Sequence, residues 1–396
     1  MTVDFTTEAA ALAADLSELR RDLHRNPELG LDLPYTQKRI LQALEGLPLE
    51  ITLGRELSSV VAVLRGGRPG PITLLRGDMD ALPVVENTGL EFASQNGSMH
   101  ACGHDLHVSG LVGAARLLAA HQAELAGTVA FMFQPGEEGM GGAKIMIDEG
   151  MFDAIGGIPD AAYAIHVAPG APGTFVTRPG TIMAGANTLH VTMHGKGGHS
   201  SRPQDSIDPV RPVLEFGQAL YAMISGSFSV FDPIVAEVTQ LSAGDAVNVI
   251  PSTASIGASV RTLSNDTTKR FPELATRLAE SIAAAHRCSA EVEWTEQYPV
   301  TVNDAAEAAF ASATLTESFG PGRVVTAPDP VMGSEDFSYV LNEVPGTFLF
   351  LFVSPEGVDP ATAATNHSPE VLFDDGHLPD QAAALATLAW QRSLRD

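Results

Sequence analysis

Apolar positions recur along the chain with two periods, one typical of helices and one typical of strands. Leucines separated by four, three and four positions, with charged residues between them, predict an amphipathic helix over residues 9–25. These leucines are Leu12, Leu16, Leu19 and Leu23. The Asn-Pro pair at 26–27 ends this helix. Short aliphatic runs at 60–64 and 72–75, separated by a segment rich in Gly and Pro, predict two sheet strands joined by a turn.

Three predicted strands are each followed by side chains that can carry chemistry. These are Asp78 and Asp80 after the strand at 72–75, Glu137 and Glu138 after a strand at 128–133, and His166 after a strand at 161–165. In open α/β sheets ligands bind outside the carboxyl ends of the strands, so these side chains are candidates for one site. Asp80 can orient a ligating histidine, and one of the two glutamates can bind a metal while the other handles protons. Solvated acidic turns are the alternative interpretation of both carboxylate pairs.

The pattern changes between residues 188 and 297, where the predicted elements follow the order β-α-β-β-α-β. They are strands at 189–193, 234–241, 254–262 and 290–294 and helices at 208–224 and 271–286. This order is that of a split ferredoxin-like arrangement and indicates a compact inserted α+β domain of about a hundred residues. The chain is therefore predicted to form one domain in two parts, 1–185 and 298–396, around a second domain at 186–297.

Helices and strands also alternate in the segments on either side of this insertion. A helix at 108–121 precedes the strand at 128–133. Beyond the insertion, helices at 305–319 and 380–394 lie on either side of a strand at 347–353. The predicted fold class is therefore α/β.

Composition and charge exclude several classes of protein. Hydrophobic residues make up 44% of the chain, yet no run of eighteen uncharged apolar residues occurs, so a membrane span is not expected. The net charge of -25 opposes binding to nucleic acid or an anionic membrane, and neither is expected as a partner. The N-terminal sequence lacks the basic and apolar regions of a secretion signal, so we expect a cytoplasmic protein. Two cysteines, Cys102 and Cys288, cannot form a disulfide framework.

Candidate chemistry is densest at residues 99–107, where three histidines, a thiol and a carboxylate occupy one short segment. Cys102 and His104 can point at one metal ion if Gly103 allows a tight turn. Asp105 can then orient a ligand side chain. A polar turn that caps the following helix is the alternative interpretation.

The chain offers five possible metal ligands, more than a single four-coordinate ion uses. They are Cys102, His104, Glu138, His166 and His367. Two metal ions, which lower the pKa of a shared water, are the simplest interpretation and suit amide hydrolysis. The motifs H-E-x-x-H and G-x-S-x-G are absent, which argues against two rival hydrolase mechanisms. Cys102 as a nucleophile, with a neighbouring histidine as its base, stays open as an alternative.

Seven motifs, in order along the chain, carry a resemblance to a known family. They lie at 20–29, 76–83, 99–107, 134–139, 195–203, 333–337 and 366–369 and so cover almost the whole chain. In these motifs the chain resembles the metal-dependent aminoacylase and carboxypeptidase superfamily, in the branch of hippurate hydrolases and plant auxin-conjugate amidohydrolases. The resemblance implies a mixed-sheet catalytic domain that holds two metals, and a smaller lid domain inserted after about residue 185. In the family this lid commonly pairs subunits, which implies a homodimer or homotetramer.

The resemblance also implies roles for individual residues. The five possible ligands match the metal-binding positions of the family, and Glu137 matches its general base. His199, in the glycine-rich loop at 195–203, resembles the lid histidine, which can donate to a developing oxyanion. Asn248 and Arg261 resemble residues that hold the substrate carboxylate. A surface position for His199 and a surface salt bridge for Arg261 are the alternatives.

The chain departs from the family pattern at two motifs. Gln204 stands where relatives often have a histidine, which puts a substrate contact from that position in doubt. Outer branches of the superfamily carry histidine in place of Asp78 and aspartate in place of Cys102, so this chain has the thiolate version of the site. Thiolate and imidazole ligands favour zinc, whereas many members of the branch that the chain resembles use manganese.

The predicted activity is metal-dependent hydrolysis of N-acyl amino acids to a carboxylic acid and a free amino acid. Two divalent metal ions are the expected cofactors, and a small-molecule N-acyl amino acid is the expected substrate. A dipeptidase or carboxypeptidase of the same superfamily is one alternative. A catalytically silent protein that binds acyl amino acids is another, which the complete ligand set and Glu137 oppose.

Overall fold

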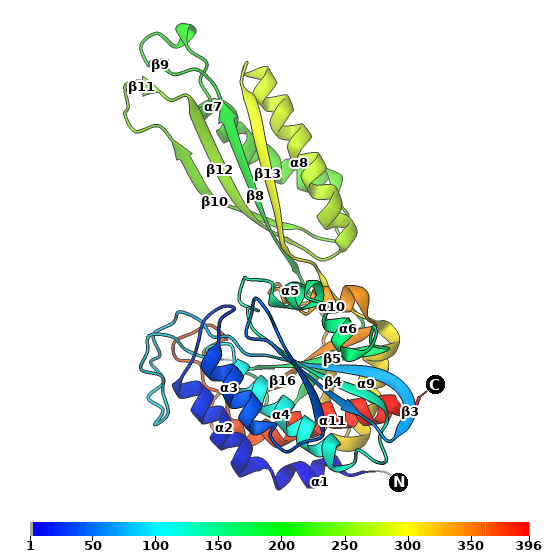
Figure 1. Cartoon of the computed structure of the whole chain (residues 1–396). Helices are drawn as coiled ribbons and strands as arrows, with labels where there is room; N and C mark the ends of the chain where they lie inside the picture. The colour runs from blue at the N-terminus through cyan, green and yellow to red at the C-terminus, as the bar shows by residue number, and fades with distance from the viewer. Residues whose placement is uncertain (1–2, 361, 396) are drawn as a thin grey trace. The chain divides into compact units, whose positions relative to one another are not determined.

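The computed structural model describes residues 3–360 and 362–395, which divide into two compact units (Figure 1). The first unit is built from Met1–Ile182, Val302–Asp329 and Asp336–Asp396. The second is built from Met183–Thr301 and Pro330–Glu335. The first unit therefore takes in both ends of the chain. The short segment Pro330–Glu335 belongs to the second unit although it lies far along the chain from the predicted insertion.

A mixed eight-stranded sheet forms the centre of the first unit, with the order β1-β2-β4-β3-β5-β16-β6-β15. Its strands are β1 (Leu49–Leu53), β2 (Val60–Arg65), β3 (Arg68–Asp78), β4 (Ala126–Gln134), β5 (Ala161–Ala168), β6 (Phe175–Thr177), β15 (Val324–Thr326) and β16 (Gly346–Phe352). Strands β4, β3, β5 and β16 run parallel to one another, so their carboxyl ends meet at one edge of the sheet.

The predicted strand pair at 60–64 and 72–75 does exist, but its members are not neighbours in the sheet. Strand β4 lies between β2 and β3, antiparallel to β2 and parallel to β3. A turn between two consecutive strands leaves their pairing open, and here β4, which follows much later in the chain, pairs with both.

Helices pack on this sheet, and two of them, α4 and α11, are almost completely buried. The helices of the first unit are α1 (Phe5–Ala10), α2 (Ala13–Arg25), α3 (Pro34–Ala43), α4 (His104–Ala120), α5 (Gly142–Asp148), α6 (Met151–Ile155), α9 (Ala305–Phe319), α10 (Ser338–Glu343), α11 (Leu378–Ser393) and the short 3-10 helix at Asp375–His377. Helices α2, α4 and α11 pack together (Figure 1). The predicted helix at 9–25 is divided, because the amides of Ala11 and Leu12 donate to residues only three positions earlier and tighten the chain there.

Helix α4 comes close to its neighbours at Gly113, and this contact supports a stability prediction. A Cβ atom at Gly113 would lie 2.6 Å from Ala382 Cβ and 2.9 Å from Leu16 Cδ1. Gly113→Ala is therefore expected to lower the free energy of unfolding by roughly 1–3 kcal/mol, measured by urea denaturation. Gly226, in helix α7 of the second unit, faces open space, so Gly226→Ala is the control and is expected to be neutral or stabilising. If Gly113→Ala and Gly226→Ala change the free energy of unfolding by the same amount, helix α4 is not tightly packed at Gly113.

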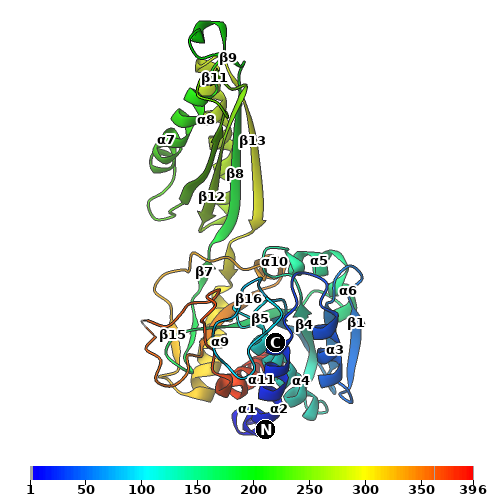
Figure 2. The same cartoon turned by 90° about the vertical axis from the view of Figure 1, so that its left-hand side faces the viewer.

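The second unit has the predicted order β-α-β-β-α-β and folds as a ferredoxin-like antiparallel sheet with strand order β10-β12-β8-β13. Its elements are β8 (Gly185–His194), β9 (Gly198–His199), a 3-10 helix at Pro203–Asp205, α7 (Val210–Ser227), β10 (Val235–Ala243), β11 (Val249–Ile250), β12 (Thr253–Thr262), α8 (Asn265–Ala285) and β13 (Ser289–Tyr298). Helices α7 and α8 lie beside the strands of this sheet (Figure 2). Alternate residues of β8 pack with Phe216 of α7 and Phe271 of α8 in a core that shares no residue with the core of the first unit. Strands β7 (Gly180–Met183) and β14 (Thr301–Asn303) form a further two-stranded sheet.

Among the described residues, no helix is both long enough and apolar enough to cross a membrane.

Candidate metal centre

Gly103 brings the polar segment at residues 99–107 to the carboxyl edge of the large sheet. Its φ of 86° is in the left-handed region, and a Cβ atom would lie 2.3 Å from Val167 Cγ2 of β5, so only glycine fits. Helix α4 begins at His104, directly after this glycine, whereas the sequence pattern predicted a start at residue 108. The difference arises because apolar periodicity becomes visible only after the polar first turn. As a result Cys102 and His104 lie on either side of a sharp bend next to β5.

The five predicted metal ligands all lie in the first unit and converge at this edge. Cys102 Sγ lies 3.4 Å from His166 Nε2, and His367 Nε2 lies 3.2 Å from Glu138 Oε1. Cys102, Glu138 and His367 have ligand atoms within 4.8 Å of one another, as do His104, Glu138 and Glu137. His166 sits inside β5, two residues before its end, rather than just after the strand.

The donor atoms present fit divalent metal ions. Two buried side-chain atoms of this cluster, His104 Nε2 and Glu138 Oε1, make no hydrogen bond of good geometry. Buried polar atoms are normally paired, so these two are explained by a ligand that the side chains hold. Thiolate, imidazole and carboxylate donors are the set that zinc and neighbouring transition metals prefer. Since Glu138 belongs to both overlapping groups of donors, the cluster suits two ions that share ligands.

The electrostatics of the cluster differ from one candidate ligand to the next. Burial and the neighbouring His107 hold the pKa of His166 well below its usual range, so this imidazole is neutral. Burial raises the pKa of Glu138, but its contact with His367, the charges of His104 and His367, and Cys102 together outweigh burial, so the net shift is downward. The neighbouring Cys102 and Glu138 side chains raise the pKa of His367 to about 10. The groups around His367 are therefore those that stabilise a positive charge.

Asp80 supports both the glutamates and His104. Its carboxylate accepts hydrogen bonds from the backbone amides of Glu137 and Glu138, each at 3.0 Å. Its backbone carbonyl accepts a hydrogen bond from His104 Nδ1 at 2.8 Å, which leaves His104 Nε2 as the nitrogen with a free lone pair. Glu137 itself is buried, with 6% of its surface exposed. Asp80 thereby fixes the orientation of the His104 ring and of the turn that carries both glutamates.

Asp105 has a different role from the one expected of it. Its carboxylate accepts hydrogen bonds from Arg20 Nε and His24 Nδ1, both at 2.8 Å, and so joins α4 to α2 rather than to a ligand side chain. The expectation that Asp105 orients a ligand is corrected accordingly. The side chain of Asp105 starts from the first turn of α4 and points towards α2, away from the bend that carries Cys102 and His104. Its two partners on α2 are the arginine and the histidine of the motif at 20–29, which explains why that motif contains them.

A buried network behind the cluster was not found from the sequence. Arg76 donates through Nη1 to Asp78 at 2.6 Å and through Nη2 to Asp336 at 3.0 Å. The other oxygen of Asp78 accepts from His107 Nδ1, because the amide of Val167 donates to His107 Nε2 at 2.8 Å. The position of Asp78 after a strand and that of Asp336 in the motif at 333–337 were signals for these residues, but nothing in the sequence joined the two, which are distant along the chain.

Two predicted residues of the second unit lie close together at the short paired strands β9 and β11, where His199 ends β9 and Asn248 directly precedes β11. The amide of Ser201 donates to His199 Nδ1 at 3.1 Å, so a neutral His199 carries its proton on Nε2 and can donate from that atom. The carbonyl of Asn248 accepts from the amide of Ser200 at 3.1 Å, and Val249 pairs with His199. Both His199 and Asn248 line an open hollow of about 480 Å³.

Arg261 lies near the other end of β12 from these two residues, so this unit does not bring the three together. Its Nη1 donates to Ser334 Oγ at 3.0 Å, and half-burial lowers the pKa of its guanidinium. A half-buried guanidinium that donates to a neutral hydroxyl suits the binding of an anion.

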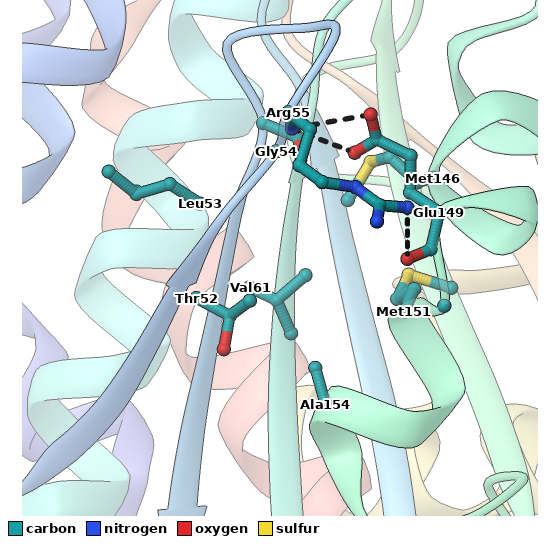
Figure 3. A pocket seen from close by; sticks show the side chains of 11 residues that line it. Thr52, Leu53, Gly54, Arg55, Val61, Met146, Glu149, Met151 and Ala154 are labelled. Atoms are coloured by element: carbon teal, nitrogen blue, oxygen red, sulfur yellow. Dashed lines mark hydrogen bonds between the residues drawn. The ribbon is translucent and has the colours of Figure 1, made fainter.

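A second cavity, of about 200 Å³, lies away from the metal cluster between β1, β2 and helices α5 and α6 (Figure 3). Leu53, Val61, Met146 and Met151 form its apolar wall. At its rim the backbone amide of Arg55 and its guanidinium both donate to Glu149. No predicted site residue lines this cavity.

The sequence and the structure were compared with known proteins. The model of a family described as peptidase family M20/M25/M40 matches residues 74–391. Thermostable carboxypeptidase 1 of Saccharolobus solfataricus is 36% identical, over 94% of each chain. IAA-amino acid hydrolase ILR1-like 2 of Arabidopsis thaliana is 37% identical over 94% of this chain and 84% of its own. N-acetylcysteine deacetylase of Bacillus subtilis is 35% identical over 85% of this chain and 87% of its own.

Among solved structures, the chain is similar to the Bacillus subtilis YXEP protein, which is described as a dinuclear metal binding peptidase from the M20 family. The TM-score is 0.83 at 31% sequence identity, and the match covers 97% of this chain and 99% of that one.

Proposed function

Because this chain belongs to peptidase family M20/M25/M40, we propose that it hydrolyses the amide bond of N-acyl amino acids to a carboxylic acid and a free amino acid. The observation that carries this proposal is the convergence of five donor side chains, with the buried carboxylate of Glu137 beside them. The relatives named as hydrolases of amino acid conjugates support the substrate class.

We assign the metal ligands as Cys102, His104, Glu138, His166 and His367, holding two divalent ions. We propose zinc or manganese as the metal. Thiolate and imidazole ligands suit zinc, and a mixed set of nitrogen and oxygen donors can also bind manganese. When bound, such ions polarise an amide carbonyl and make water more acidic. Asp80 keeps His104 and the glutamate turn in position through the three hydrogen bonds described above.

Glu137 is the proposed general base and acid. Its carboxylate accepts a proton from the attacking water and then delivers that proton to the nitrogen of the leaving amino acid, so one side chain serves both steps. The hydrogen bond of its amide to Asp80 and its burial hold the carboxylate beside the ligands and away from bulk water.

The second unit is proposed to contribute to substrate binding. His199 donates through Nε2 to the oxyanion that develops on the carbonyl, a role that its Nδ1 hydrogen bond with Ser201 supports. Arg261 and Asn248 are proposed to hold the carboxylate of the amino acid. We further propose that this unit acts as a lid and pairs subunits into a homodimer or homotetramer. We propose a small-molecule substrate and a cytoplasmic location, and the net charge of -25 opposes nucleic acid or an anionic membrane as a partner.

The test is a panel of acetyl, benzoyl and longer acyl amino acids, together with dipeptides, offered to protein loaded with manganese or zinc. Release of free amine from acyl amino acids is expected, with two ions per chain by elemental analysis and loss of activity on chelation. Faster release from dipeptides would favour the carboxypeptidase alternative, which the first relative's name supports. Activity that survives exhaustive chelation would assign the reaction to Cys102 as a nucleophile instead. If no compound is hydrolysed but one raises the melting temperature, the chain is a binding protein.

A further inference from the structure

The side chain of Asn366 contacts Cys102 and Val167 at three atoms. The proposed function assigns no role to these contacts of Asn366. Its Nδ2 lies 3.3 Å from the carbonyl oxygen of Cys102, 3.2 Å from that of Val167 and 3.7 Å from Cys102 Sγ. Asn366 is partly buried and directly precedes His367.

The orientation of this amide follows from its partners. A backbone carbonyl oxygen can only accept a hydrogen bond, so the group that faces Cys102 and Val167 is the NH₂ group and not the side-chain oxygen. The same NH₂ group is the one that faces Cys102 Sγ. The sulfur is therefore placed as an acceptor, which is the role of a thiolate.

The three acceptors lie on two segments, each of which carries an assigned ligand. Cys102 is itself a ligand, and Val167 directly follows His166 in β5. The carbonyl of Val167 also accepts from His166 Nδ1 at 2.7 Å, so Asn366 and the ring of His166 share one acceptor. That hydrogen bond leaves His166 Nε2 unprotonated and facing Cys102 Sγ.

The third ligand segment is the loop of Asn366 itself. His367 has a φ of 71°, in the left-handed region that a residue with a side chain rarely adopts. Its amide donates to the carbonyl of Ala101 at 2.9 Å, next to Cys102. This loop is therefore held in a strained conformation against the Cys102 segment by backbone and side-chain hydrogen bonds together.

We propose that Asn366 is a positioning residue of the metal centre, whose NH₂ group donates to the Cys102 sulfur and joins the segments of Cys102, His166 and His367. The inference rests on the proposed function for the assignment of these three residues as ligands. Through its hydrogen bond the amide withdraws charge from the sulfur and fixes its direction, while the two carbonyl contacts set the spacing of the three segments. Partners of this kind orient metal ligands, and their loss typically weakens metal binding by about 10–100-fold.

The test uses cobalt(II) as a probe of the sulfur. Full-length parent protein and Asn366→Leu, which keeps the volume but removes the donor, are titrated with cobalt and followed by the thiolate-to-cobalt charge-transfer absorption. In Asn366→Leu the band is expected at longer wavelength, because the sulfur regains electron density, and cobalt is expected to bind about 10–100-fold more weakly. The matched control is Asn96→Leu, since Asn96 donates to the carbonyl of Pro27, and its band is expected to match that of the parent.

The outcomes separate this inference from the function on which it rests. If parent protein shows no thiolate-to-cobalt band, Cys102 is not a ligand and the ligand assignment itself fails. If the band is present and Asn366→Leu leaves both its position and the cobalt affinity unchanged, the inference is overturned. Asn366→Asp, which keeps the shape but removes both N–H groups, decides the matter if Asn366→Leu does not fold. Loss of the metal-free fold in both variants, measured by melting temperature, would assign Asn366 to chain stability and overturn the inference as well.

Discussion

Replacement of Glu137 by glutamine is expected to lower kcat by roughly 10²–10⁴-fold, the usual contribution of a general acid-base group. Glutamine has nearly the shape of glutamate but cannot accept a proton from water at neutral pH. The backbone hydrogen bond of residue 137 to Asp80 does not depend on the side chain, so the turn is expected to keep its conformation. KM and the number of bound ions are therefore expected to stay close to those of the parent.

Two further variants make this result specific. Glu138→Gln changes the neighbouring residue, which is an assigned ligand, and is expected to lower the metal content measured by elemental analysis. Glu124→Gln changes an exposed glutamate outside the cluster and is expected to leave kcat and metal content unchanged. Rates near those of the parent for Glu137→Gln with full metal content would refute the assigned role of Glu137.

Strong periodicity in the sequence predicted individual elements well. The helix predicted at 305–319 has the same bounds in the structure, and the strand predicted at 254–262 differs by one residue. The ferredoxin-like order of the second unit was predicted correctly for the same reason, since each of its elements buries one face against a shared core. Local patterns of this kind are present in the sequence without any knowledge of tertiary contacts.

Strand pairing and side-chain direction could not be predicted in the same way. The insertion of β4 between β2 and β3 depends on contacts between segments that are distant along the chain. The residues of the metal cluster were identified because their chemistry is unusual, yet Asp80 and Asp105 looked equivalent in the sequence. The structure separates them, because the direction of each side chain is set by the bend at Gly103 and by the packing of α4 on α2.

Replacement of Arg76 by methionine is expected to lower the free energy of unfolding by about 3–5 kcal/mol, as is typical when one partner of a buried ion pair is removed. Arg76, Asp78 and Asp336 each expose 2% of their surface or less. Methionine fills much of the same volume but leaves both carboxylates without the guanidinium that neutralises them. Urea denaturation of metal-free protein measures the effect without a contribution from bound ions. Arg65→Met, which breaks an exposed pair with Glu50, is the control and is expected to cost less than about 1 kcal/mol.

If the loss of stability in Arg76→Met is electrostatic, its size is expected to depend on pH. Burial raises the pKa of Asp336 even with Arg76 present, and without Arg76 this pKa is expected to rise further. The pKa of Asp78, which Arg76 and two histidines hold well below its usual range in spite of burial, is also expected to rise when Arg76 is lost. A group whose folded pKa lies above its unfolded pKa takes up a proton on folding, so stability rises as the pH falls. The difference between Arg76→Met and the parent is therefore expected to be largest near pH 7 and to shrink towards pH 4. Adding Asp336→Asn to Arg76→Met is expected to restore part of the stability at pH 7. A pH-independent loss that Asp336→Asn does not reduce would mean that Arg76 acts through packing rather than charge.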